Sequence, residues 1–210
     1  PANAEHFGRP GGTKGERAAF PQARVVALAE CGTHAMFAAK VGTYGQSEAT
    51  LTEPLLQALE PGMLLTADRA FFSYALWRRA IGTGADLLWR VRTDSAGPKP
   101  THLDDLADGS WLAHLRSSAT AAARRQEPML VRVVDYTIDD GRANAVSYRL
   151  FTTLTDPEEV SASELAAAYT HRWEIEVAFD ELKTHQRGPR TVPRSKRSGA
   201  TCAATSRSAR

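Results

Sequence analysis

Four polar residues in the last third of the chain share one line along a predicted helix. Tyr169, Arg172, Glu176 and Lys183 have the spacing Y-x2-R-x3-E-x6-K. At about 100° per residue they fall within an arc of roughly 60°, and they extend over roughly 21 Å at the rise of an α-helix. Arg and Lys neutralise phosphates, Tyr can stack on a base or bond a phosphate oxygen, and Glu can hold a metal ion beside that backbone. We therefore interpret the line as a candidate nucleic-acid site with Glu176 as its acid.

A simpler interpretation of the same helix stays open. Arg172 and Glu176 form an i,i+4 pair, and such pairs stabilise many exposed helices by a few tenths of a kcal/mol. The apolar residues of the helix cluster beside the polar line, which places Glu176 at the margin of the predicted buried face: Ala168, Ile175, Phe179 and Leu182. Trp173, next to that face, is expected to pack and is left out of the site.

Asp68 is the second candidate acid. It follows Met63–Ala67, a short apolar run that predicts a strand buried on both faces. Open α/β sheets place ligand-binding groups just past the carboxyl ends of such strands. The alternative is that Asp68 only caps a helix beginning near Phe71.

Two carboxylates from different elements predict a hard cation. Asp68 and Glu176 would suit Mg²⁺ or Mn²⁺, which prefer oxygen ligands and keep water. A pair of such ions can activate a water or a 3′-hydroxyl for displacement at phosphorus. Zinc is not expected, because Cys31 and Cys202 are far apart and form no ligand pair. A glycoside hydrolase that uses the same two acids as an acid/base pair is a further alternative.

The elements that would position these residues follow an α/β order. A hairpin, a helix, a buried strand, a helix and a strand are predicted at Ala23–Glu30 with Ala35–Val41, Ser47–Leu59, Met63–Ala67, Phe71–Ile81 and Leu87–Arg92. Ser47 is the expected N-cap of the first helix. Residues 1–22 show no period and are expected to be loop.

The second half of the chain is predicted to be β-rich up to one long helix. Two strand-like runs, Met129–Ile138 and Ala145–Leu154, flank the turn signal Asp139-Asp140-Gly141. Ser161–Gln186 then gives the longest helix pattern, with Ser161 or Ser163 as the expected cap at its start. We expect four segments: the first part of the main domain (1–93), a β-rich insertion (94–160), the helix with the polar line (161–188) and a basic, disordered tail (189–210).

Charge is distributed unevenly along the chain. The net charge is +2, but residues 187–210 hold seven Lys or Arg and no acid. A basic end favours a polyanionic partner, although a solvated tail explains the charge equally well. No stretch approaches the roughly 20 apolar residues of a membrane span, and no signal peptide is recognisable, so we expect a cytoplasmic protein without membrane contact.

The sequence resembles a known family at these motifs. Tyr169, Arg172, Glu176 and Lys183 match the signature of the DDE transposases of the insertion sequence 4 family. Leu64–Phe72 (LLTADRAFF) resembles that family's second catalytic block, with Asp68 as its acid. The similarity is expected over roughly residues 1–192.

The resemblance implies both a fold and an activity. The fold would be ribonuclease H-like, with a mixed sheet, flanking helices and a β-rich insertion before the last helix. Asp68 and Glu176 would be catalytic metal ligands in a three-acid site with two Mg²⁺ or Mn²⁺ ions, and Tyr169, Arg172 and Lys183 would hold the DNA. The partner would be double-stranded transposon-end and target DNA in a bacterial cell, with a homodimer possible in the synaptic complex.

The sequence departs from the family pattern in two places. The family's first acid lies on a strand upstream, and residues 1–67 contain no aspartate. Beyond about Val192 an apolar helix is expected, and a segment rich in Ser, Arg, Ala and Thr stands there instead. We therefore expect a truncated and catalytically incomplete transposase, with a non-catalytic DNA-binding remnant as the alternative.

Overall fold

The structure, a computed structural model, describes residues 2–11, 20–117, 120–138 and 146–181. These residues form two compact units, which are described separately. Of the described residues, those up to Leu55 together with Glu174–Glu181 form one unit, and those from Leu56 to Trp173 form the other. The predicted division of the chain into four segments stays a prediction. Among the described residues, no helix is both long enough and apolar enough to span a membrane.

The first unit is built on the predicted hairpin. β1 (Ala23–Ala29) and β2 (Met36–Thr43) pair antiparallel, as expected. α2 (Glu48–Thr52) is capped by Ser47, whose side chain accepts a hydrogen bond from the Thr50 N–H, and this confirms the predicted N-cap. The unit also contains α1 (Ala2–Phe7), which was predicted as loop, and α6 (Glu174–Glu181).

The predicted helix 47–59 is wrong as a single α-helix. After Thr52 the chain continues as a 3-10 helix, η1 (Glu53–Ala58), which contains Pro54. Proline has no N–H for an α-helical hydrogen bond, and its ring clashes with the carbonyl four residues earlier. The apolar face was predicted correctly, because its four leucines are buried: Leu51, Leu55, Leu56 and Leu59.

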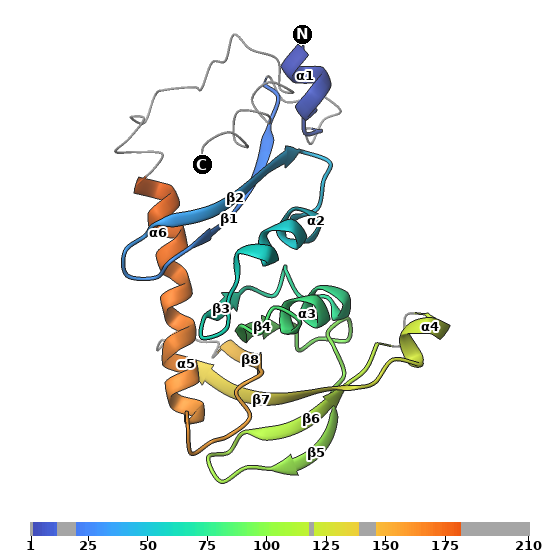
Figure 1. The fold of residues 1–210 in the computed structure, drawn as a ribbon, viewed down its shortest axis with the longest axis vertical. Helices are drawn as coiled ribbons and strands as arrows, with labels where there is room; N and C mark the ends of the chain where they lie inside the picture. Colours follow the sequence, from blue (N-terminus) through green and yellow to red (C-terminus); the bar gives the residue numbers. More distant parts are fainter. Residues whose placement is uncertain (1, 12–19, 118–119, 139–145, 182–210) are drawn as a thin grey trace. The chain divides into compact units, whose positions relative to one another are not determined.

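The second unit contains a six-stranded mixed sheet with flanking helices (Figure 1). Its strands are β3 (Leu64–Ala67), β4 (Asp86–Val91), β5 (Thr101–Asp105), β6 (Trp111–Leu115), β7 (Met129–Ile138) and β8 (Val146–Thr152), in the order β3-β4-β8-β7-β6-β5. β3 and β4 are parallel, and the other neighbours are antiparallel. Its helices are α3 (Tyr74–Ile81), α4 (Ala121–Arg124) and α5 (Ala162–Thr170). The predicted β-rich stretch therefore shares one sheet with β3 and β4.

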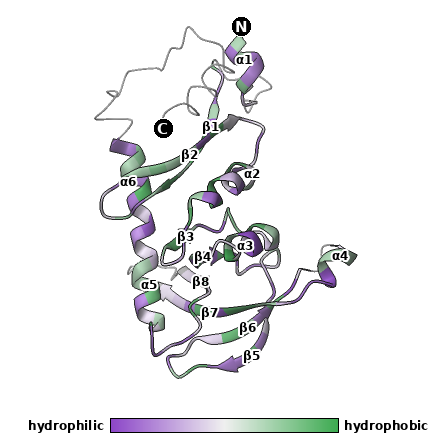
Figure 2. Ribbon diagram, viewed as in Figure 1, coloured by the Kyte–Doolittle hydropathy of each residue, from purple (hydrophilic) through white to green (hydrophobic). Residues whose placement is uncertain are grey.

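The two edge strands were predicted poorly. β3 was expected to be buried on both faces, but it is the edge strand next to β4, and Leu64 is 41% exposed. A short apolar run indicates a strand without telling how many neighbours it has. β5 was not predicted, because its sequence is mostly hydrophilic (Figure 2) and lacks the apolar alternation of a strand. All five of its residues are exposed. Charged, polar edge strands of this kind protect a sheet from pairing with other chains.

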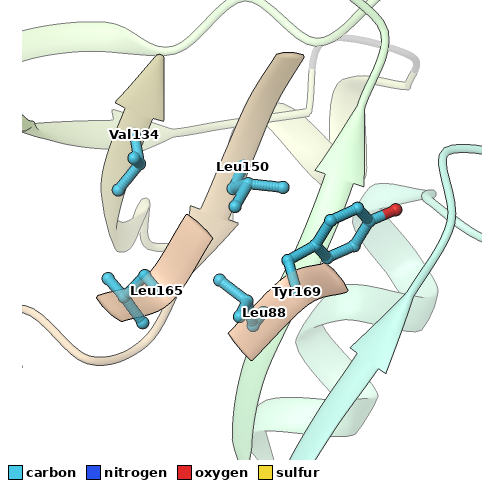
Figure 3. Packing of buried hydrophobic residues seen from close by; sticks show 5 residues of the cluster. All are labelled: Leu88, Val134, Leu150, Leu165 and Tyr169. Atoms are coloured by element: carbon cyan, nitrogen blue, oxygen red, sulfur yellow. The ribbon is translucent and has the colours of Figure 1, made fainter. Parts of the chain in front are cut away.

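Helices α3 and α5 cover opposite faces of this sheet. Neighbouring residues of a strand point to opposite faces, and on β4 Leu88 packs with α5 while Trp89 packs with α3. Trp77 of α3 meets Trp89 edge to face with 5.2 Å between ring centroids. On the other face, two residues of α5 join three strand residues in a buried cluster (Figure 3): Leu165, Tyr169, Leu88, Val134 and Leu150.

The predicted helix 161–186 is interrupted within its first half. Ser161 caps α5 through a capping box with Glu164, as one of the two expected caps. The α-helix ends at Thr170, a 3-10 turn η2 (His171–Trp173) follows, and α6 begins at Glu174. A 3-10 turn has three residues per turn instead of 3.6, so the angles calculated for one continuous α-helix do not hold across residues 171–173. Residues 182–186 lie outside the described part.

Candidate active site around Asp68

Asp68 stands directly after β3, at the carboxyl end of a strand that is parallel to its neighbour. Its side chain is 33% exposed, and Oδ1 accepts a hydrogen bond from the Arg69 N–H at 2.7 Å. The alternative role as a helix cap is wrong, because α3 begins at Tyr74 and is capped by Ser73, whose Oγ accepts from the Leu76 N–H. Asp68 is therefore left without a helix-capping role.

Two further side chains approach Oδ1 of Asp68. The hydroxyl of Tyr169 donates to it at 3.5 Å, and Nη1 of Arg90 lies 3.9 Å away. Arg90 follows Leu88 by two residues on β4 and shares its face of the sheet. The carboxylate is thus set between a phenol from α5 and a cation from β4.

Tyr169 has a structural role that the sequence did not predict. Its ring is 3% exposed and packs in the cluster beneath α5, while its hydroxyl points away from the aliphatic side chains of that cluster (Figure 3). Burial raises the pKa of the Tyr169 hydroxyl, and this effect outweighs the opposing influence of Arg172. The hydroxyl is therefore protonated at neutral pH and able to donate.

Arg90, which sequence reasoning missed, is held by aromatic rings. Its guanidinium carbon lies 4.1 Å from the centroid of the Tyr148 ring, and Tyr148 stacks on Tyr136 at 5.2 Å. Contacts of this kind between a cation and a ring face are favourable and fix the orientation of the guanidinium. A polar residue two positions after a buried Leu on a core strand was the signal that could have identified Arg90.

Arg172 lies on the 3-10 turn rather than on an α-helix. Its guanidinium carbon is 5.6 Å from the ring centroid of Tyr169 and 4.6 Å from that of Trp173. Trp173 is 54% exposed, so the expectation that it packs in the core is wrong. An exposed Trp beside an Arg offers a flat, cationic surface next to Tyr169.

Glu176 belongs to the other unit. It is exposed on α6, two residues before the buried Ala178. Its helix is joined to the β1–β2 turn, where Glu174 accepts a hydrogen bond from the Gly32 N–H and His34 lies 3.4 Å from Glu181 through Nδ1. The pairing of Glu176 with Asp68 stays a prediction, and Lys183 lies outside the described residues.

The oxygen donors of Asp68 suit a hard cation. Within the described part of the chain, every hydrogen bond and ion pair of this carboxylate goes to Oδ1. Oδ2 can therefore serve as a ligand of the kind that Mg²⁺ and Mn²⁺ accept. Among the same residues no three His, Cys, Asp or Glu side chains gather closely enough to hold a metal ion. Asp68 can supply one ligand of a metal site, and the described residues do not supply the other ligands beside it.

The comparisons with known proteins match transposases, as the sequence motifs predicted. The chain matches the family model described as "Transposase DDE domain" over residues 3–207, so the match extends beyond the expected limit near residue 192. It is 28% identical over 183 residues to the transposase InsG for insertion sequence element IS4 of Escherichia coli (strain K12). That alignment covers 87% of this chain and 41% of the relative. Because the family model matches nearly the whole sequence, the chain belongs to the transposase DDE domain family.

Proposed function

We propose that the chain is part of a transposase that acts on transposon-end DNA by metal-dependent phosphodiester cleavage and strand transfer, on a ribonuclease H-like fold. The observation that carries the proposal is the placement of Asp68. It lies at the carboxyl end of β3 and is 33% exposed, and among the described residues Arg90 and the hydroxyl of Tyr169 contact its Oδ1 and not its Oδ2. Membership of the transposase family supports this interpretation.

The proposed roles follow from the chemistry of each side chain. Asp68 and Glu176 would hold Mg²⁺ or Mn²⁺, which would supply activation of the attacking oxygen and stabilisation of the leaving oxygen. Arg172 and Lys183 would neutralise DNA phosphates. Tyr169 would act through its hydroxyl, because its buried ring offers no face for stacking on a base.

The 210 residues alone are proposed to be catalytically incomplete. The family's site uses three acids, and no aspartate precedes Asp68 in this sequence. A site without one bridging acid loses affinity for at least one ion, and displacement at phosphorus depends on both. A non-catalytic DNA-binding role is therefore the second candidate, favoured by the seven Lys or Arg in residues 187–210.

The test compares two proteins on DNA that carries the flanks of the coding sequence. The 210-residue chain should not cleave this DNA with Mg²⁺ or Mn²⁺, whereas a chain extended upstream by a family strand that bears the aspartate should. If the 210-residue chain cleaves the DNA and Glu176→Gln abolishes this cleavage, the proposal that the chain is catalytically incomplete is wrong. Full activity of Glu176→Gln in the extended chain would overturn the role of Glu176.

A further inference from the structure

Arg132 of β7 carries a buried charge that the candidate site does not use. Its side chain is 0% exposed, and it stands two residues before Val134, so it shares the α5 side of the sheet with the apolar cluster of Figure 3. Its guanidinium donates to the Asp108 carboxylate through Nη2 and to Oγ of Ser110 through Nε, the latter at 2.8 Å. Both partners lie between β5 and β6. We name Asp108, Ser110 and Arg132 the Arg132 network.

The Arg132 network holds the chain on both sides of the start of α5. Oδ2 of Asp108 accepts a hydrogen bond from the Ala162 N–H, in the first turn of the helix, at 2.6 Å. In the loop before the helix, Nη1 of Arg132 donates to three carbonyls at 3.3, 3.3 and 2.8 Å: Leu154, Asp156 and Val160. The entry to α5 is therefore bound to the sheet by directed hydrogen bonds, all of them within the second unit.

The apolar packing beneath α5 fixes its position less closely. Leu165 and Tyr169 pack on the sheet in a buried cluster, but apolar contacts are non-directional and tolerate small displacements of a helix. Hydrogen bonds to a planar guanidinium depend on distance and angle. A displaced helix start would leave buried donors of Arg132 without acceptors, which is costly. A buried ion pair often stabilises a fold no more than a well-packed apolar pair does, so its distinctive contribution here is geometry.

The position of α5 decides where the hydroxyl of Tyr169 lies. Tyr169 follows Ala162 by two turns of the same helix, or about 10.5 Å along its axis. Its hydroxyl meets Oδ1 of Asp68 at 3.5 Å, at the long limit of a hydrogen bond. A displacement of α5 by about 0.5 Å away from Asp68 would therefore break the contact.

We propose that Arg132 and Asp108 are positioning residues, which act through α5 to keep the hydroxyl of Tyr169 on Asp68. The β-rich stretch then does more than extend the sheet, because its β5–β6 turn and β7 fix the helix that carries Tyr169. The proposal rests on the proposed function in one respect: the contact serves catalysis only if Asp68 holds a reactive metal ion. The contact itself can be measured without metal or DNA.

The test follows the side-chain carboxylate carbon of Asp68 by NMR, in the 210-residue chain at neutral pH. Tyr169→Phe should shift this resonance, because the hydroxyl leaves Oδ1. In an Asp108→Ala background the same substitution should produce less than about half of that shift, because the hydroxyl no longer lies on Asp68. Comparing Tyr with Phe within each background cancels the effect of a displaced ring. Ser110→Ala, a milder change that removes only the acceptor of the Arg132 Nε, should reduce the shift in part.

Leu115→Ala is the matched control for lost stability. Leu115 is fully buried opposite Met129, which stands three residues before Arg132 and therefore faces the α3 side. Its truncation leaves a cavity and lowers the unfolding temperature without touching the Arg132 network. The full Tyr169→Phe shift should remain in this background. Thermal unfolding of each variant shows that the comparison is made between folded chains of similar stability.

Three outcomes would refute the positioning role. One is a Tyr169→Phe shift that stays complete in both the Asp108→Ala and the Ser110→Ala backgrounds. The second is an equal reduction of the shift in Leu115→Ala, and the third is the absence of any shift in the otherwise unaltered chain.

The catalytic consequence is tested separately in the extended chain described above. Asp108→Ala should slow DNA cleavage by about as large a factor as Tyr169→Phe, and combining the two should slow it little further. An extended chain that does not cleave DNA at all would refute the proposed function, whereas the NMR result would still decide the positioning role.

Discussion

The hydroxyl of Tyr169 lies 3.5 Å from Oδ1 of Asp68, and the ring of the same residue is 3% exposed. One side chain thus belongs both to the core beneath α5 and to the candidate site at the end of β3. This explains why a Tyr, and not another hydrogen-bond donor, suits the position. A buried ring holds the hydroxyl in place, and burial keeps it protonated by raising its pKa.

The two roles of Tyr169 can be separated by two substitutions. Tyr169→Phe keeps the packed ring and loses one long hydrogen bond, so the free energy of unfolding should fall by less than about 1 kcal/mol. Tyr169→Ala empties the core position and should cost about 3–5 kcal/mol. Urea unfolding followed by the fluorescence of Trp77 and Trp89, both fully buried in the same unit, measures this. Equal losses in the two variants would contradict the packing role of the ring.

Asp68 should bind Mn²⁺ weakly even without the other acids. Its side chain is 33% exposed and can supply Oδ2 as a ligand, while Arg90, 3.9 Å from Oδ1, opposes a second cation. We expect Mn²⁺ to broaden the amide resonance of Arg69, whose N–H donates to this carboxylate. Asp68→Asn should abolish the broadening, and Arg90→Met should produce it at a severalfold lower Mn²⁺ concentration. Broadening that persists in Asp68→Asn would place the ion elsewhere.

The sequence predicted those parts of the fold that depend on local signals. The hairpin, Ser47 and Ser161 as caps, and β7 with β8 follow from alternation and capping chemistry. The predicted turn Asp139-Asp140-Gly141 lies outside the described residues. The interruptions at Pro54 and at residues 171–173 were missed because the spacing of apolar residues in the sequence does not distinguish a continuous α-helix from one that contains a short 3-10 turn. Pro54 was a visible signal for the first of them.

The position of Asp68 after β3 was predictable, whereas the residues around it were less so. Asp68 was identified from its place after an apolar strand, and the structure removes its alternative role as a cap. Arg90 and Tyr148 were missed because their contact joins β4 to β8, residues distant in sequence that only the sheet pairing brings together. Tyr169 was placed on a polar line, although the sheet opposite α5 buries its ring.

Glycine at position 34, in the turn between β1 and β2, should be more stable than alanine. His34 has a φ of 58°, in the left-handed region that costs most residues with a side chain about 1 kcal/mol. His34→Ala loses the contacts with Glu174 and Glu181 and keeps the strain, whereas His34→Gly loses the same contacts and relieves it. We expect the amides of β1 and β2 to be better protected from hydrogen exchange in His34→Gly than in His34→Ala, by about 1 kcal/mol in the free energy of opening. Equal protection would contradict the left-handed conformation.

A buried ion pair should make the second unit sensitive to acid. Arg132 is fully buried and donates to the Asp108 carboxylate, to Ser110 and to three carbonyls of residues 154–160. Asp108 also accepts from the Ala162 N–H at 2.6 Å, at the start of α5. Burial by itself raises the pKa of Asp108, but the hydrogen bonds from Ser110 and Ala162 and the charge of Arg132 together lower it from 3.8 to about 2.

The direction of the pH effect follows from this lowered pKa. Because the pKa of Asp108 is lower in the folded state than in the unfolded state, its contribution is complete above about pH 4 and is lost as the pH falls toward about 2. The loss should amount to about 2 kcal/mol in the free energy of unfolding. Urea unfolding of the second unit, followed by tryptophan fluorescence at several acidic pH values, measures it. Asp108→Asn should be less stable at neutral pH and should lack this part of the pH dependence, since no carboxylate remains to be protonated beside Arg132. A variant that keeps the full acid dependence would assign it to other carboxylates.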